Sequence, residues 1–258
     1  AIASDVDNTM ASAVKVVSGF HPIIAAKFKR LVPGPAIGVA YGEANSNATT
    51  TIAAGAQIFG DSVSLSASDT NDFNVVTKAK IKGIKVPNLG NAFAVALSFV
   101  ESDANVNVNG SVTARETDIT IDASSIDLNN DVFTVAKIKR ALGGLAGKAA
   151  GAGGGAGLKP ASNAGAIGIA GAVSIVVSNN DANAFVGGSA TLFANRDLWL
   201  RAYAEDNFKA ISIAGAKLAS TVAIGGGIAV TDYTNTADAE IGDGATVTCT
   251  YTNAEVAA

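Results

Sequence analysis

The sequence predicts an all-β chain wound into a parallel β-solenoid, or β-helix, and three observations lead to this fold class. A unit of about 56 residues recurs along the 258-residue chain, apolar and polar residues alternate within each unit, and small residues dominate the composition. Hydrophobic residues make up 48% of the chain, but aromatic residues make up only 6%. Stacked coils can close over Ala, Val and Gly without large side chains, so this composition favours a solenoid. Tandem small β-sandwich modules are the alternative.

Four similar segments mark the repeat: ATTTIAAG at 48–55, ANVNVNG at 104–110, ANAFVGG at 182–188 and ADAEIGDG at 237–244. Their first residues are 56, 78 and 55 positions apart. The longest interval contains an insertion near 141–161, and a second unusual segment occupies 20–35. Because insertions at one phase of a repeat map to loops on one face of a solenoid, we expect both to be loops. We expect 1–258 to be a single continuous solenoid segment cut from a longer chain.

Within each unit the apolar residues follow a period of two, as in VSLSAS, DITIDAS and DLWLRAYA. This alternation is typical of half-buried strands. Clusters of Asn, Asp and Ser separate the apolar runs, and we interpret these clusters as turns. They are SDTNDFN, SSIDLNND, SNNDAN, AEDN and TDYTNTAD. A unit of this length then divides into three coils of about 18 or 19 residues. About 13 such coils would form a rod roughly 60 Å long.

The composition excludes several classes of protein. The single cysteine, Cys249, cannot form a disulfide within the chain or a cysteine-based zinc site, and one histidine cannot make a His-rich metal centre. A net charge of −4 argues against nucleic acid as the partner. No apolar run reaches the ~18 residues of a membrane-spanning helix.

The cations are the candidate functional residues, because they gather at corresponding phases of successive units. Stacking would place them along one side of the solenoid as a basic stripe. Such a stripe suits an anionic polymer, for example a surface polysaccharide, or the acidic flank of a neighbouring copy. The alternative is that long lysine stems cover apolar surface and keep an edge soluble. The candidate binding residues are Lys27, Lys29, Arg30, Lys78, Lys80, Lys82, Lys85, Lys137, Lys139 and Arg140.

No catalytic, cofactor-binding or metal-binding residue is predicted, and the chain is not expected to be an enzyme. Calcium is an alternative, because acidic residues in the expected turns could supply oxygen ligands. A polysaccharide-acting enzyme on a β-helix is a second alternative, since it needs Asp or Glu clustered with Lys or Arg on one face. The possible calcium ligands are Asp69, Asp72, Asp127, Asp131, Asp181, Asp206, Asp232, Asp238 and Asp243.

Two segments carry a family resemblance: AVSIVVSNNDANAFVGGSATLFA at 172–194 and IAVTDYTNTADAEIGDGATVT at 228–248. They resemble the β-strand repeats of giant secreted bacterial surface proteins, including leukotoxin-like autotransporters and haemagglutinin-type adhesins. The resemblance implies a structural or adhesive rod at the bacterial cell surface, outside the cell, and it supplies no catalytic residue. A self-assembling filament or sheet component is the alternative function.

Overall fold

The computed structural model describes residues 1–19, 35–82, 90–139, 168–217, 223–250 and 254–258. In these residues the chain forms strands and no helix. The strands are β1 (Ile2–Gly19), β2 (Ala36–Ile52), β3 (Gln57–Gly60), β4 (Val63–Lys82), β5 (Gly90–Val108), β6 (Ser111–Ala114), β7 (Ile119–Lys139), β8 (Gly168–Val186), β9 (Thr191–Ala194), β10 (Leu198–Lys217), β11 (Ala223–Ile241), β12 (Thr246–Cys249) and β13 (Ala254–Ala257).

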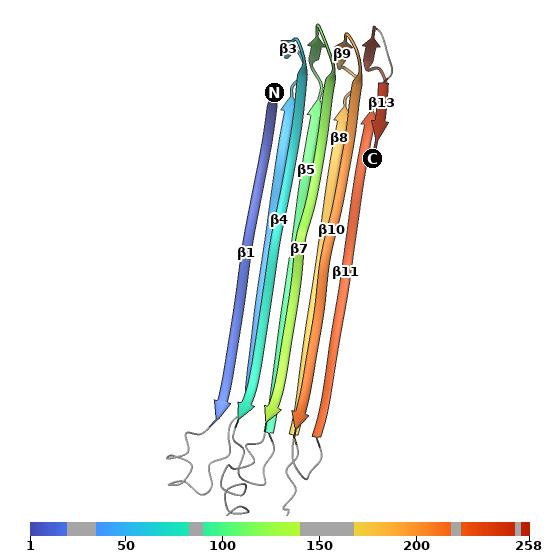
Figure 1. Cartoon of the computed structure of the whole chain (residues 1–258). Helices are drawn as coiled ribbons and strands as arrows, with labels where there is room; N and C mark the ends of the chain where they lie inside the picture. Colours follow the sequence, from blue (N-terminus) through green and yellow to red (C-terminus); the bar gives the residue numbers. More distant parts are fainter. Residues whose placement is uncertain (20–34, 83–89, 140–167, 218–222, 251–253) are drawn as a thin grey trace, which may run out of the picture.

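The strands assemble into three parallel sheets, which confirms the predicted β-solenoid. A five-stranded sheet has the order β1-β4-β7-β10-β13, and a four-stranded sheet with the order β11-β8-β5-β2 packs against it. A narrow sheet of short strands, β12-β9-β6-β3, closes the upper end (Figure 1). Each coil is a long strand, a short strand and a second long strand. Every pairing joins one repeat to the next, so the chain does not form separate β-sandwich modules.

Each repeat forms one coil, and the expected division into three coils is wrong. Val63 pairs with Ile119, and Ala36 pairs with Ala92, in both cases 56 residues further along. The pairing of β5 with β8 spans the longer interval, since Gly90 pairs with Gly168. The strands are therefore far longer than expected: the 20 residues of β4 extend about 66 Å. The long dimension of the molecule runs along the strands rather than along the stack of coils (Figure 1).

The Asn, Asp and Ser clusters caused this error, because they lie inside long strands instead of at turns. SDTNDFN is part of β4, SSIDLNND of β7, SNNDAN of β8, AEDN of β10 and TDYTNTAD of β11. In a parallel stack the backbone N–H and C=O groups of these residues form hydrogen bonds with the neighbouring coils. A polar cluster therefore need not end the strand. Within these described strands the pairing is interrupted by a bulge near the exposed Leu128, where β7 carries one more residue than β4 and than β10.

The interior between the long sheets is apolar near the short strands. Leu65, Ile121 and Leu200 occupy one row across β4, β7 and β10, and each is fully buried. Ala48, Ala104 and Ala182 form a row of small residues on the four-stranded sheet, in the same buried cluster. Large and small buried side chains together make the thin core that the composition predicted.

A buried polar belt crosses the interior halfway along the strands. On the five-stranded sheet Asn71, Asp127 and Asp206 lie in register. Asn71 Nδ2 donates to Ser46 Oγ at 3.0 Å and also to the hydroxyl of Ser102. Ser102 Oγ in turn donates to Asp127 Oδ1 at 3.3 Å. The Asn and Asp side chains that were expected at turns therefore tie the two sheets together.

Burial in this belt raises the pKa of its carboxyl groups. The pKa of Asp127 is raised by desolvation, although Ser178 Oγ donates a hydrogen bond of 2.7 Å to its Oδ2. Asp206 has a pKa of about 6, first because of desolvation and second because of the charge on Asp127. Both carboxyl oxygens of Asp206 are buried without a hydrogen-bond partner. The pKa of the fully buried Asp69 is also raised by desolvation.

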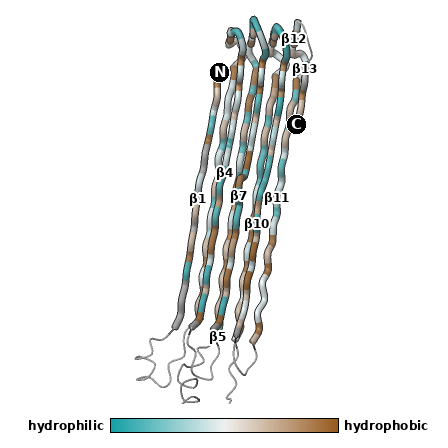
Figure 2. Tube along the Cα trace, viewed as in Figure 1, coloured by the Kyte–Doolittle hydropathy of each residue, from teal (hydrophilic) through white to brown (hydrophobic). Residues whose placement is uncertain are grey.

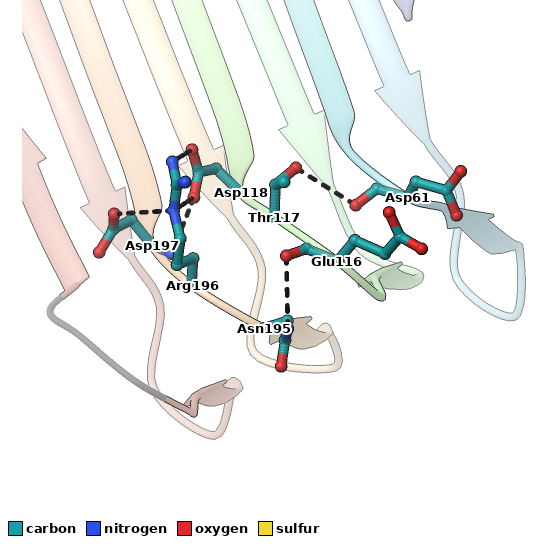
Figure 3. A network of polar contacts seen from close by, with 7 residues as sticks. All are labelled: Asp61, Glu116, Thr117, Asp118, Asn195, Arg196 and Asp197. Carbon is teal, nitrogen blue, oxygen red and sulfur yellow. Dashed lines mark hydrogen bonds and ion pairs between the residues drawn. The ribbon is translucent and has the colours of Figure 1, made fainter.

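Two of the four glycine-containing segments need glycine for the backbone conformation of their corner. Gly55 (φ 81°) and Gly244 (φ 92°) each occupy the third position of a four-residue turn between a long and a short strand. This backbone conformation favours glycine. The next corner ties coils to one another: Arg196 Nη2 lies 2.7 Å from Asp118 Oδ2, and Thr117 Oγ1 donates to the Asp61 carbonyl at 3.3 Å (Figure 3).

Candidate functional site: the basic end of the five-stranded sheet

The described lysines of the predicted stripe lie at one end of the five-stranded sheet, opposite the short strands. Lys80 of β4 pairs in register with Lys137 of β7, and Lys15 of β1 pairs with Lys78 of β4. These positions alternate with the buried Thr77, Ala79 and Ile81 and therefore face outward. Parallel strands lie about 4.8 Å apart, so lysines of successive coils are immediate neighbours on this face.

The row closest to the end of the sheet contains three more lysines. The Cα atoms of Lys82, Lys139 and Lys217 are in register across β4, β7 and β10. At this row three successive strands of the sheet contribute a lysine position, whereas β1 contributes Gly19. The structure places Lys78, Lys80, Lys82, Lys137 and Lys139 on one end of one sheet. The remaining candidates, Lys27, Lys29, Arg30, Lys85 and Arg140, lie outside the described residues, as do nearly all of the expected loops at 20–35 and 141–161.

A shallow hollow on the same outer face combines lysines with apolar side chains. Lys78 and Lys209 border it, and Val76, Phe133 and Ile211 form an apolar row across three strands. Lys78 Nζ lies 5.9 Å from the centre of the Phe133 ring, within the range of a cation–π contact. We call this surface, from the hollow to the lysine rows, the basic end.

Sequence reasoning found five lysines of the basic end, but it left Lys15, Lys209 and Lys217 out of the candidate set and missed the apolar residues. Phe133 and Val76 were assigned to no face, because the chain was divided into shorter strands. Their positions share the period-two phase of Lys78 and Lys137, which was the signal that could have identified them.

One of the residues that line the hollow is a carboxylate. Asp131 is in register with Lys209 and lines the hollow. Arg196 forms ion pairs with Asp118 and Asp197 at the far end of the strands (Figure 3). A glycosidase of the usual kind needs two facing carboxylates, whereas the residues that line the hollow supply one.

The acidic residues proposed as calcium ligands are distributed differently from the expectation. Only Asp243 lies in a turn, whereas the other eight lie within long strands, either in the polar belt or on outward faces. Among the residues that the structure describes, no group of three or more His, Cys, Asp or Glu side chains could hold a metal ion.

Comparison with known proteins gives no match, whether with protein-family models, curated proteins or solved structures. Within the described ranges no helix is long and apolar enough to cross a membrane.

Proposed function

We propose that this chain is a structural and adhesive segment of a large bacterial surface protein, in which the basic end binds an anionic polymer such as a surface polysaccharide. One observation carries the proposal: lysines from successive coils stack in register on one face. An anionic chain lying across the strands would meet lysines of two or three successive coils at each row. Each contact is weak, but contacts made by a single polymer add up.

The charge of the whole chain supports a local rather than a general attraction. The net charge is −4, so a polyanion is repelled by the molecule as a whole and attracted only where cations are concentrated. Close lysines repel one another at a cost in stability, which gives their clustering a functional explanation. The apolar row beside them offers contact to the carbon skeleton of a sugar ring.

A location outside the cell is part of the same proposal. The repeats at 172–194 and 228–248 resemble those of secreted bacterial surface proteins. A stack of identical coils lengthens simply by adding repeats, which suits a rod that projects from a surface.

Retention on an immobilised anionic polysaccharide across a salt gradient tests the binding. One variant carries Lys78→Gln, Lys137→Gln and Lys209→Gln at the basic end. Its matched control carries Arg115→Gln, Arg196→Gln and Arg201→Gln, which removes the same charge near the other end of the strands. The proposal predicts retention that weakens with salt, is lost in the first variant and persists in the second. No retention of the natural chain at low salt, or equal loss in both variants, would refute it.

A further inference from the structure

The outward face of the four-stranded sheet carries large apolar side chains where a solvated sheet would carry polar ones. One row crosses all four strands in register: Ile228, Val173, Val95 and Val39. The next row runs from Val230 to Tyr41. Ile228 is 58% exposed and Val39 is 54% exposed, so nothing in the described part of the chain covers them. We call the outward positions within 37–41, 93–99, 173–177 and 224–230 the apolar half.

The remaining outward positions of the four-stranded sheet are mostly polar or acidic. Those within 43–51, 101–107, 179–185 and 232–240 are mostly Asn, Thr, Asp and Glu, and we call them the acidic half. Glu43, Glu101 and Asp232 lie near the boundary between the halves. Figure 2 shows this division along β11, whose hydrophobic residues lie in its lower half. If apolar side chains were simply tolerated on this face, they would occur along the whole length of each strand.

The apolar half has the sequence pattern of a sheet that is covered on both sides. Strands with one solvated face alternate apolar and polar residues, whereas strands covered on both faces are apolar at consecutive positions. The β8 segment GIAGAVSIVV and the β5 segment NAFAVALSFV follow the second pattern. The interior covers one face of these segments, so the second face lacks its partner.

We propose that a second copy of this chain covers the apolar half, and that the two copies pack face to face. The area suits a weak, reversible pair. The apolar half has 14 outward positions, each covering about 6.7 by 4.8 Å, which gives about 450 Å² per copy and about 900 Å² for the pair. Interfaces below about 1,200 Å² are typical of weak, transient association. This inference is independent of the basic end, which lies on the other sheet.

The acidic half determines the orientation of the two copies. The described outward residues of this sheet include no Lys or Arg, so two acidic halves in contact would repel each other. A two-fold axis parallel to the strands would bring the acidic halves together about 10 Å apart. An axis perpendicular to the strands stacks only the apolar halves and directs the acidic halves away from each other. Each strand then faces its own counterpart in antiparallel direction, and longer solenoids could pair coil by coil.

Sedimentation equilibrium, without any polymer present, tests the pairing. The proposal predicts a monomer–dimer equilibrium for the natural chain. Val95→Glu with Ile175→Glu places charges in the middle of the interface and should weaken the dimer at least ~100-fold. Asn105→Glu with Asn183→Glu adds the same charges on the same strands in the acidic half and should leave the dimer intact. Val95→Thr with Ile175→Thr keeps strand propensity and should also weaken the dimer. This variant keeps the test valid if the Glu variant misfolds.

Chemical crosslinking tests the orientation. In a Cys249→Ser background, Val39→Cys lies in the apolar half and Thr51→Cys lies at the far end of the acidic half. A bis-maleimide that spans about 10 Å should join two copies through position 39 and not through position 51. Crosslinking through both positions would contradict the antiparallel arrangement. A chain that stays monomeric at all concentrations overturns the proposal, and binding of that monomer to phosphatidylcholine vesicles would make the apolar half a lipid contact instead.

Discussion

Replacing Asp206 by asparagine should make the protein more stable at neutral pH. Asp206 faces Asp127 of β7 in register, and the nearby Ser178 hydroxyl of β8 donates to Asp127 instead. Both oxygens of its carboxylate are therefore buried beside another acid and accept no hydrogen bond. An asparagine has nearly the same shape and carries no charge. It would extend the row that begins with Asn71.

The pKa of Asp206 sets the size and the sign of the effect. Its pKa is raised from 3.8 to about 6, which corresponds to about 3 kcal/mol without solvent screening. Asp206 is only partly buried as a residue, so about 1–2 kcal/mol is the appropriate magnitude. Between about pH 4 and pH 6 the folded state keeps a proton that the unfolded state releases. The contribution of Asp206 to stability is therefore most favourable below about pH 4 and is lost as the pH rises through about 6.

Urea unfolding at several pH values between about 4 and 8 measures this effect. The natural chain should lose stability as the pH rises, and Asp206→Asn should reduce the slope and be the more stable form at pH 8. Some slope should remain, because burial also raises the pKa values of Asp69 and Asp127. Asp232→Asn removes an exposed carboxylate and should not change the slope. Equal slopes in the natural chain and in Asp206→Asn would refute the reasoning.

Three further predictions concern the stack of coils, and urea unfolding measures each of them. Ile121→Ala should cost about 2–5 kcal/mol because Ile121 is fully buried, whereas Thr120→Ala, on the outward face of the same strand, should cost less than about 0.5 kcal/mol. Val63→Asp should unfold the neighbouring coils by burying an unpaired charge, and a midpoint equal to that of the natural chain would show that Val63 does not face inward. Gly55→Ala should cost about 1–2 kcal/mol from its positive φ alone, because the added Cβ would meet nothing within 4 Å. Gly226→Ala, which also has space but no positive φ, should be neutral or stabilising.

The repeat in the sequence predicted the fold because its length determines which residues of neighbouring strands pair. Residues one repeat apart pair in register, as Ala48 does with Ala104, so the spacing of similar segments equals the length of one coil. The period of two predicted which residues of VSLSAS face inward. These features depend on local alternation and on stacking, and both are visible in a single sequence.

Two other features, the polar belt and the apolar half, depend on which residues lie opposite one another in space. They could not be predicted from the neighbouring residues in the sequence. Asn71 looked like a turn residue because its polar partners, Ser46 and Ser102, lie 25 and 31 positions away in the chain. The apolar half was missed for a related reason, since consecutive apolar residues do not show which face packs on the interior. The lysines of the basic end were found because like residues recur at one phase, but their apolar neighbour Phe133 has no such repeat.

The distance between spin labels at positions 64 and 78 tests the central structural claim, that each repeat forms one coil with long strands. Ser64 and Lys78 both lie on β4 and face outward. In a Cys249→Ser background, double electron–electron resonance should give a distance of about 46 Å, because 14 residues of one extended strand separate the labels. A distance below about 25 Å would mean that the chain turns back within SDTNDFN, and the one-coil account would then be wrong.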